Sequence, residues 1–517
     1  MSLTLSFDHQ IESMADPKKP IDPGNLERNI SVSAGTSGEL QKRFSTFNVL
    51  AVCVTLMATW EAIGGVFAGG LVAGGPVALL YGYFLALVGT LATCLSLAEL
   101  ASLCPTSSGQ IHWTAILAPP QYARLGSWIT GWITTLGWQA FTASAAFLGA
   151  TMVQGLVVLT YPSYQSARWH GTMIYWAILL LAFLVNTVGI KIMPAIENGI
   201  LIFHVTTFLA VLIPLVVLAP HNSAEYVFTS FENNSGWESD GVAWLLGLMS
   251  AAYVLVGYDG ACHLSEEMHN APVALPRVMI GTILLNSMLG LGFLFALLFC
   301  LGDIESVLSS KSGFPIIQIF YNTTGSTAAT AALMTPFISV AIASTFGLLA
   351  STSRTTWAFA RDNGLPYSRY LSKVTTNSTL PLYSIIFSTV FMAALGLINI
   401  ASTTAFNAIV SLSVVSLYTS YLIPILFHLI RRASGPPITY GPFRLGKYGI
   451  ILNIIAAAYS TLIIVFLFFP PYMPVTSENM NYASVVFGAV LVVSGLGWLI
   501  WGRTDGGYVV GLTGDRN

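Results

Sequence analysis

WEAIGG (60–65) interrupts an apolar run that extends from residue 49 to residue 71, and GYDG (257–260) interrupts another that begins at residue 242. Glycines and an ionisable group are costly in the middle of a membrane span unless the opened backbone lines a polar cavity. Two interrupted spans in corresponding positions of two halves are the usual sequence sign of a transporter's substrate site. The two interruptions therefore predict a carrier of a small solute.

The composition places the chain in a lipid bilayer. Of its 517 residues 55% are hydrophobic and only 8% are charged, and the mean hydropathy is +0.73. That is too little polar surface to coat a soluble protein of this length. Residues 1–44 are polar and predict a disordered cytoplasmic tail. The net charge of -2 and the dispersed basic residues give no sign of a nucleic-acid partner.

Apolar windows of about 20 residues predict an all-α polytopic membrane protein with twelve transmembrane helices. The expected spans are 49–71, 76–97, 125–159, 173–190, 199–218, 242–264, 278–301, 328–359, 382–400, 406–430, 450–469 and 485–501. A unit of five spans repeated once would cross in opposite senses, which predicts an inverted five-plus-five repeat. Residues 45–430 would then form the transport core, residues 431–502 two additional helices, and residues 503–517 a cytoplasmic tail.

The basic residues predict the orientation. With both termini in the cytoplasm, only Arg168 and Lys311 lie outside, so that 18 of the 20 Lys and Arg lie inside. We therefore expect a multi-pass protein, of the plasma membrane, with cytoplasmic ends. Two glycosylation sequons, at Asn233 and Asn322, fall in outer loops and are expected to carry glycans.

The opened helices are the expected substrate site. Free N–H groups at a helix start suit a carboxylate, and free carbonyl groups at a helix end suit an ammonium group. The residues expected to bind substrate are Glu61, Ala62, Ile63, Gly64 and Gly65 in the first span and Val256, Gly257, Tyr258 and Asp259 in the sixth. Close helix packing is the alternative explanation for the glycine pairs.

Other ionisable groups lie within or at the ends of spans. His204, inside the fifth span, could hold or pass a proton, or could be a hydrogen-bonded packing residue. Near the cytoplasmic ends, an inner gate is expected, with solvated charges as the alternative. Its candidate members are Glu99 and the cluster of His263, Glu266 and Glu267, with Arg354 and Arg361 as the cations that they could reach.

Neither a cofactor nor a metal ion is expected. GPFRLGKY (441–448) has the spacing of a phosphate-binding loop only as far as its Lys, and Tyr448 stands where Ser or Thr is needed to bind magnesium. No nucleophile and base occur at a spacing that would suit a transferase. We therefore expect transport driven by a gradient or by exchange, and no enzymatic activity.

Four segments resemble the signatures of a known family. They are LAELASLCPTSSGQIHWTAILAPP (97–120), SWITGW (127–132), GYDGACHLSEEMHNAPVALPRVM (257–279) and SRTTWAFARDNGLP (353–366). The chain, from about residue 44 to residue 501, resembles the amino acid–polyamine–organocation superfamily in its fungal amino acid and choline transporter branch. The resemblance implies a LeuT-like fold of ten core helices plus two. In similar bacterial proteins a Lys that links transport to protons occupies the position of His204.

Three functions follow from these observations. The first is a proton-coupled permease for an amino acid or a related amine such as GABA, with the small molecule, protons and the lipid bilayer as its partners. The second is a choline carrier, in which Glu61, Asp259 and aromatic rings surround a quaternary ammonium group. The third is a nutrient sensor that binds its ligand without transporting it.

Overall fold

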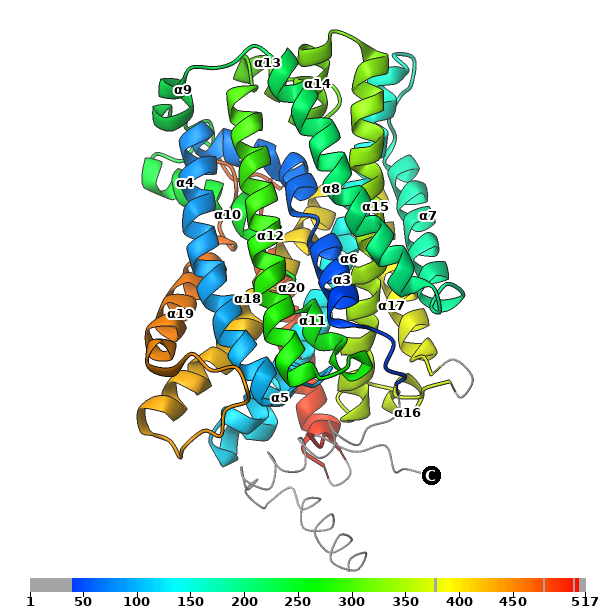
Figure 1. Cartoon of the computed structure of the whole chain (residues 1–517), viewed down its shortest axis with the longest axis vertical. Coiled ribbons are helices and arrows are strands. Elements are labelled where there is room, and N and C mark those ends of the chain that lie inside the picture. Colours follow the sequence, from blue (N-terminus) through cyan, green and yellow to red (C-terminus); the bar gives the residue numbers. More distant parts are fainter. Residues whose placement is uncertain (1–39, 376–378, 478, 505–506, 511–517) are drawn as a thin grey trace, which may run out of the picture.

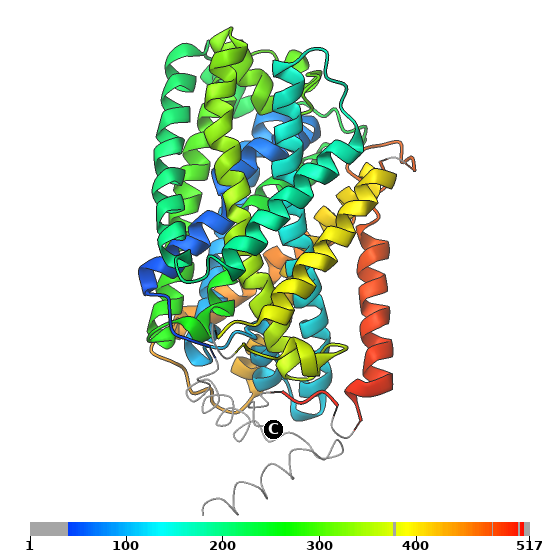
Figure 2. The ribbon, with the colours of Figure 1, turned by 90° about the vertical axis from the view of Figure 1, so that its right-hand side faces the viewer.

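The computed structural model describes residues 40–375, 379–477, 479–504 and 507–510, without the side chains of 403–408 and 410. In these parts of the chain the regular structure is helical, and the only bridge between extended residues joins Phe44 and Met268. Ten helical stretches are long and apolar enough to cross a membrane. The helices stand side by side, and both described ends of the chain lie at the lower end of the bundle (Figures 1 and 2). The predicted class, an all-α polytopic membrane protein, is confirmed.

The elements follow one another along the whole chain. The first half holds α3 (Thr46–Met57), α4 (Thr59–Leu103), α5 (Gln110–Leu117), α6 (Pro120–Thr160), α7 (Arg168–Thr187), α8 (Met193–Leu218), α9 (Ala224–Thr229), α10 (Asp240–Val254), α11 (Gly260–His263) and η1 (Ser265–Glu267). The second half holds α12 (Ala271–Phe299), α13 (Ile304–Leu308), α14 (Pro315–Thr324), α15 (Thr327–Arg361), α16 (Ser368–Leu371), α17 (Leu382–Ala401), α18 (Thr403–Ser434), η2 (Gly446–Tyr448), α19 (Gly449–Phe466), α20 (Ala483–Gly497) and η3 (Trp498–Gly502).

The first apolar stretch, Thr46–Leu103, is much longer than one crossing. Its 58 residues would span roughly 87 Å as one straight helix, about three times the thickness of the hydrocarbon core. Within α4, Gly74 and Gly75 leave the helical conformation, and Gly75 has a φ of 64°. Only glycine adopts such a conformation without strain. The arms of α4 before and after this turn run in different directions (Figure 1).

Two long helices, α6 and α15, pack against each other inside the bundle. They contact each other closely, and α6 also contacts α18. At Gly131 of α6, an added Cβ would lie 2.2 Å from the ring of Phe359 in α15. A side chain there would force these helices apart, so the glycine permits their close approach.

The described ends of the chain carry side chains that are buried against the bundle. Residues 1–39, 505–506 and 511–517 lie outside the described residues. Of the described ones, Leu40 and Phe44 are buried at the N-terminal end, and Tyr508 and Val510 are buried at the C-terminal end. These apolar and aromatic side chains gain more by packing against the bundle than by solvation. Within the ranges predicted as tails, 1–44 and 503–517, these four described residues therefore pack against the bundle.

Candidate functional site

The first membrane stretch opens at Ala58. α3 ends at Met57, α4 begins at Thr59, and Ala58 between them has the left-handed conformation, with φ 40° and ψ 49°. The predicted opening, from Ala62 to Gly65, is instead helical. The sequence-based position of this break was therefore wrong by four residues or more.

The glycines that suggested the wrong position serve packing. An added Cβ at Gly64 would lie 2.5 Å from Ile316 and 2.8 Å from Phe337, and one at Gly65 would lie 2.7 Å from Leu148. Contacts this short are not tolerated without movement of the neighbouring side chains. The alternative that the sequence left open, close helix packing, explains both positions.

The second break lies where the sequence predicted it. α10 ends at Val254 and α11 begins at Gly260, so Val256, Gly257, Tyr258 and Asp259 all lie between the two helices. Gly257 has a φ of 108°, and an added Cβ there would lie 3.0 Å from the ring of Phe141. Glycine is required at this position both for its backbone conformation and for the space.

The two breaks meet inside the bundle. The hydroxyl of Thr59, the first residue of α4, donates a hydrogen bond of 2.9 Å to the carbonyl of Val254, the last residue of α10. Both residues are buried. The start of one helix, with its free N–H groups, therefore lies beside the end of another, with its free carbonyl groups.

A buried acid–base pair lies directly beyond the first break. His204 Nδ1 on α8 is 2.8 Å from Glu61 Oε1 on α4, and both side chains are shielded from solvent. The ring of Trp60 packs on the imidazole with its centroid 5.8 Å away. Within the described residues, Glu61 Oε2 and His204 Nε2 have no hydrogen-bond partner. The sequence singled out both residues but did not predict that they form a pair, because α4 and α8 are far apart in the sequence.

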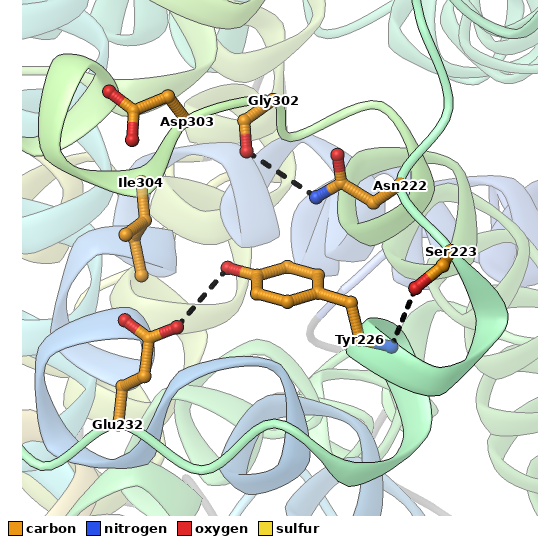
Figure 3. A pocket seen from close by; sticks show the side chains of 7 residues that line it. All are labelled: Asn222, Ser223, Tyr226, Glu232, Gly302, Asp303 and Ile304. Atoms are coloured by element: carbon orange, nitrogen blue, oxygen red, sulfur yellow. Dashed lines mark hydrogen bonds between the residues drawn. The ribbon is translucent and has the colours of Figure 1, made fainter.

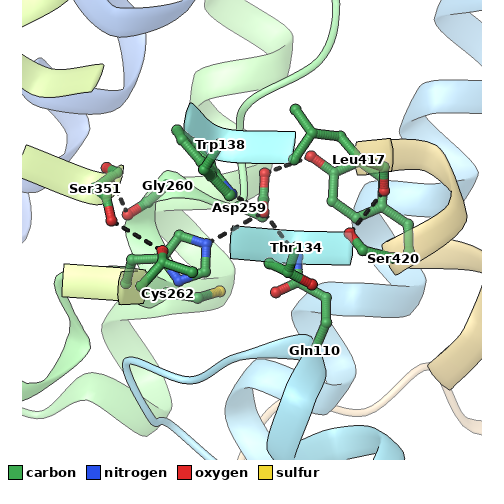
Figure 4. Close-up of polar contacts among 12 residues, drawn as sticks. Gln110, Thr134, Trp138, Asp259, Gly260, Cys262, Ser351, Leu417 and Ser420 are labelled. Carbon is green, nitrogen blue, oxygen red and sulfur yellow. Dashed lines mark hydrogen bonds and ion pairs between the residues drawn. The ribbon is translucent and has the colours of Figure 1, made fainter. Parts of the chain in front are cut away.

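Asp259 is enclosed by donors from four elements. Its carboxylate accepts hydrogen bonds from Gln110 at 2.7 Å, Trp138 at 3.2 Å and Tyr421, and His263 Nε2 lies 3.4 Å away. Figure 4 shows Asp259 between Gln110 and Trp138. The sequence predicted Asp259 but not its partners on α5, α6 and α18. Gln110 lies in a segment that carried the family resemblance, and this was the one available signal for it.

Two ion pairs close the lower end of the bundle. Arg361 donates two hydrogen bonds of 2.9 Å to Glu266, and Arg354 donates one of 2.8 Å to Glu267. The backbone N–H of Phe44 also donates to the Glu267 carbonyl at 3.1 Å. Burial acts to raise the pKa of Glu266, but the charge and hydrogen bonds of Arg361 outweigh it and hold the pKa below its ordinary value. The predicted contacts of Glu266, Arg354 and Arg361 are present.

The two other predicted gate residues lie elsewhere. Glu99 pairs with Arg432 of α18 and accepts a hydrogen bond of 2.7 Å from the N–H of Leu445. His263 lies 2.9 Å from the carbonyl of Ser107, beside Asp259. The sequence showed that these residues lie near the ends of spans. It did not show in which direction each side chain points from its helix.

At the opposite end of the bundle is a polar cavity of about 400 Å³. It is lined by Asn222, Ser223, Tyr226, Glu232, Gly302, Asp303 and Ile304 (Figure 3). The hydroxyl of Tyr226 donates to Glu232 at 3.4 Å. Burial, together with the charge of Glu232, raises the pKa of Tyr226 to about 12. Two carboxylates and a tyrosine make this cavity favourable for cations.

The two sequon asparagines differ in their surroundings. Asn233 uses its side-chain amide to donate to the Trp237 carbonyl at 2.8 Å and to Asp240 at 3.1 Å. Asn322 is exposed on α14, and its carbonyl oxygen accepts from Gln318 at 2.8 Å. Of these two asparagines, Asn233 is the one whose side-chain nitrogen donates hydrogen bonds within its loop in the described structure.

Comparison with known proteins gives one consistent result. A family model described as amino acid permease matches residues 44–491. The chain is 33% identical to a putative amino acid/polyamine transporter of Macrophomina phaseolina, over 83% of this chain and 95% of the relative. It is 30% identical to a choline transporter of Saccharomyces cerevisiae, over 94% and 86%, and 32% identical to an amino-acid permease of Arabidopsis thaliana, over 91% and 93%.

Proposed function

The chain belongs to the amino acid permease family of the amino acid–polyamine–organocation superfamily, and on that premise we propose that it is a proton-coupled carrier of a small zwitterion such as GABA or a neutral amino acid. It is a multi-pass membrane permease and not an enzyme. Its relatives include amino-acid permeases and a choline transporter, so its substrate class is amino acids or choline.

Twelve crossings are the arrangement that we propose for the chain. The stretch Thr46–Leu103 supplies two of them because α4 turns at Gly74 and Gly75, and the interrupted pair α10 and α11 supplies one that is not among the ten long stretches. The first ten crossings form the inverted repeat, and α19 and α20 are the two additional helices. The breaks at Ala58 and at 255–259 then fall in the first and sixth crossings.

The contact between the two breaks carries the proposal. Because Thr59 bonds to the Val254 carbonyl, opposite helix ends face the same point in the interior. A substrate carboxylate would bind the free N–H groups at the start of α4, those of Thr59 and Trp60. The substrate ammonium group would bind the carbonyls of Val256 to Tyr258 and the carboxylate of Asp259. Asp259 would have to exchange at least one of its present donors for the substrate.

The pair of Glu61 and His204 is the proposed coupling site. It joins α8 to the first turn of α4, where substrate would bind, and each partner keeps one atom without a hydrogen bond in the described structure. Protonation of the pair turns a net negative site into a neutral one beside the substrate carboxylate. Such a change favours binding of the anionic group, so proton and substrate would bind together.

A choline carrier is the second candidate. The observation that favours it is the aromatic environment of Asp259, which lies against Trp138 and Tyr421, with the ring of Tyr258 5.6 Å from that of Tyr421. Rings around a carboxylate suit a quaternary ammonium group. A nutrient sensor, the third candidate, would bind either ligand without accumulating it.

Uptake into proteoliposomes separates these candidates. Labelled GABA, alanine and choline would each be supplied with and without an imposed pH gradient, and with an uncoupler. We expect one of the zwitterions to accumulate only while the gradient lasts. Accumulation of choline alone would favour the second candidate, and saturable binding without accumulation would favour the sensor.

His204→Gln tests the coupling site in the same vesicles. Glutamine keeps a polar contact to Glu61 but cannot hold the extra proton. We expect loss of gradient-driven accumulation with retained exchange of labelled for unlabelled substrate at equal pH. His170→Gln is the matched control, because His170 contacts Tyr164 in a part-buried position far from both breaks. Unchanged accumulation by His204→Gln would remove the pair from the coupling mechanism.

We propose a plasma-membrane location with both ends in the cytoplasm, supported by the uneven distribution of Lys and Arg along the chain.

We further propose that Asn322 carries a glycan and Asn233 does not, because a glycan on the Asn233 nitrogen would displace a hydrogen bond that holds its loop. We expect the gel shift after enzymatic deglycosylation to vanish in Asn322→Gln and to persist in Asn233→Gln. The reverse pattern would contradict this assignment.

A further inference from the structure

Glu197 is an acid deep inside the bundle that neither the substrate site nor the ion pairs use. It lies on the second turn of α8 and is completely buried. Its Oε2 accepts a hydrogen bond of 2.9 Å from the hydroxyl of Thr55 on α3. Its Oε1 has no partner, and no ion pair joins it to any described residue.

The position of Glu197 relates it to the proposed coupling site. It precedes His204 by seven residues on the same helix, which is two turns and about 10 Å, so both side chains point from one face of α8. Both are buried, Glu197 where α8 packs against α3 and His204 beside Glu61 of α4. Glu197 is the nearer of the two to the end of the bundle that the Arg–Glu pairs close.

A polar contact continues from Glu197 towards that end. The next residue, Asn198, accepts a hydrogen bond of 3.1 Å from the side chain of Asn48, near the start of α3. Both asparagines are partly exposed. The seam between α3 and α8 therefore carries polar groups from the solvent-accessible rim inwards, past Glu197 and Thr55.

No fixed charge compensates Glu197. On its own helix the other titratable group is His204, which contacts Glu61; on α3 it is Cys53, which lies within electrostatic reach. The charged residues of α15 are Arg354 and Arg361, both bound to η1, and that of α12 is Arg277, which is exposed. α14 has no charged residue. An ionised carboxylate without a cation is costly in such surroundings, so Glu197 can be stored as a neutral acid and can ionise when water reaches it.

We propose that Glu197 is the inner proton station of the transport cycle, which receives the proton that the pair of Glu61 and His204 releases and passes it to the cytoplasm along the seam of Asn48 and Asn198. The inference rests on the proposed proton coupling. Neutral Glu197 first gives its proton to water at the rim and becomes a carboxylate. One proton then leaves the imidazolium of His204, which becomes neutral imidazole, and joins the Glu197 carboxylate. The two residues stand about 10 Å apart along the axis of α8, so water or the Thr55 hydroxyl must carry the proton between their side chains.

Glu197→Gln is the decisive variant, because glutamine keeps the shape and the hydrogen bond to Thr55 but cannot take up a proton. The probe is whichever of labelled GABA or alanine the wild-type protein accumulates. We expect the initial rate of gradient-driven uptake to fall by about a hundredfold, the scale of a positioned proton acceptor. Exchange at equal pH should stay within about twofold of wild type, since it needs no net proton movement. Glu305→Gln, at an exposed position beyond the membrane stretches, is the matched control.

A second measurement needs no substrate. Infrared difference spectra of the wild-type protein between alkaline and acidic buffer should contain a carboxylic-acid carbonyl band that Glu197→Gln lacks. Identical spectra for the two proteins would overturn the proposal. So would equal losses of gradient-driven uptake and of exchange in Glu197→Gln, because these would indicate a structural role.

The outcomes also separate this inference from the proposed function. A wild-type protein that ignores the pH gradient would refute proton coupling, and the role of Glu197 would fall with it. A wild-type protein that responds to the gradient, together with an unchanged Glu197→Gln variant, would refute the role of Glu197 alone.

Discussion

Glu266 and Arg361 illustrate how one ion pair makes the closed lower end depend on pH. The pKa of Glu266 is lower in the folded protein than in the unfolded chain, because the pull of Arg361 exceeds the effect of burial. A lowered carboxyl pKa contributes stability above the unfolded value, and this contribution disappears as the pH falls through the folded value. The pair should therefore weaken in acid.

Glu266→Gln tests this dependence. Removing one partner of a buried pair costs about 3–5 kcal/mol, so the variant should unfold at a lower temperature in neutral detergent solution. The difference from wild type should stay constant above the ordinary glutamate pKa of about 4.3 and shrink below it. Thermal unfolding across this pH range measures the effect. A difference that grows in acid would contradict the assigned direction.

Gly257 gives a prediction about backbone strain. Gly257→Ala places a Cβ at a φ of 108°, 3.0 Å from Phe141, and a non-glycine residue in such a region costs about 1–3 kcal/mol. We expect lower thermal stability and loss of uptake together. Gly199→Ala is the control, because no atom lies within 4 Å of the added Cβ on α8, and stability there should rise slightly or stay equal. Equal behaviour of the two variants would contradict the requirement at Gly257.

At the scale of single residues, the useful signal in the sequence was a polar group that interrupts an apolar run. Asp259 and His204 were found in this way, and both are buried in the structure. Glu197 was not found because AIENG (195–199) resembles an ordinary polar helix end. The pairing of Glu61 with His204 depends on how α4 and α8 pack, and this information is not local in the sequence.

Among the helices, the two interruptions differ in how visible they are in the sequence. The second contains a glycine with a left-handed φ and an aspartate, which are direct signs of an opened backbone. The first is at Ala58, whose left-handed conformation is unfavourable for a residue with a side chain and is enforced by packing around it. Such a position cannot be read from residue type, so the more obvious glycines nearby were chosen in its place.

The C-terminal segment 507–510 acts as a brace beneath α6 and α15. The hydroxyl of Tyr508 bonds to Ser127 at 2.5 Å, its ring packs on Trp128 and Phe359, and the N–H of Val509 donates to the Asp362 carbonyl at 3.1 Å. The segment thereby joins two elements that are far apart in the sequence.

Substitutions of Tyr508 measure this brace. Tyr508→Phe loses one hydrogen bond, worth about 1 kcal/mol, whereas Tyr508→Ala also leaves a cavity and should cost about 3–5 kcal/mol. Ser127→Ala should match Tyr508→Phe. The midpoint temperatures of thermal unfolding in detergent would rank the three variants by stability. If Tyr508→Ala were as stable as wild type, the segment would not support the bundle.

For the whole molecule, the structure has its lower end closed. Phe44 lies against Met268, the N–H of Phe44 bonds to Glu267, and the Arg–Glu pairs join η1 to α15. In the proposed orientation this end faces the cytoplasm, and release of substrate there would require these contacts to separate. α3 is the element that would have to move, since its start is held by them and its end is free to hinge at Ala58.

Cross-linking tests this movement. Cysteines introduced at Ser45 and His269, the exposed neighbours of the bridge between Phe44 and Met268, should be joined by a short bifunctional thiol reagent, and joining them should abolish uptake. A reagent with a cleavable spacer should restore uptake after reduction. The five native cysteines are buried and provide a low background, and each single-cysteine variant is a control. Full uptake with the link in place would show that this end does not open between these residues.

At this scale the sequence predicted the helical class and the membrane location. Apolar periodicity and composition report directly on those properties. The packed ends of the chain were missed, because Leu40, Phe44 and Tyr508 are isolated apolar residues in polar segments. An isolated apolar residue of this kind is buried only if the folded bundle offers a space for its side chain, and the sequence does not show that space.

The turn at Gly74 and Gly75 has a consequence for biogenesis. Between the two arms of α4 the sequence LVAGGPVAL (71–79) contains no charged or polar side chain, so nothing marks a loop that must be translocated. Both arms would leave the ribosome as one continuous hydrophobic hairpin. The two arms can then insert into the bilayer together. Its apex is later covered by the segment around Ser230 and Asn234, whose backbone bonds to Val77 and Val72. Nascent chains halted before that segment emerges should already be membrane-anchored, with their apex accessible to a protease added from the far side.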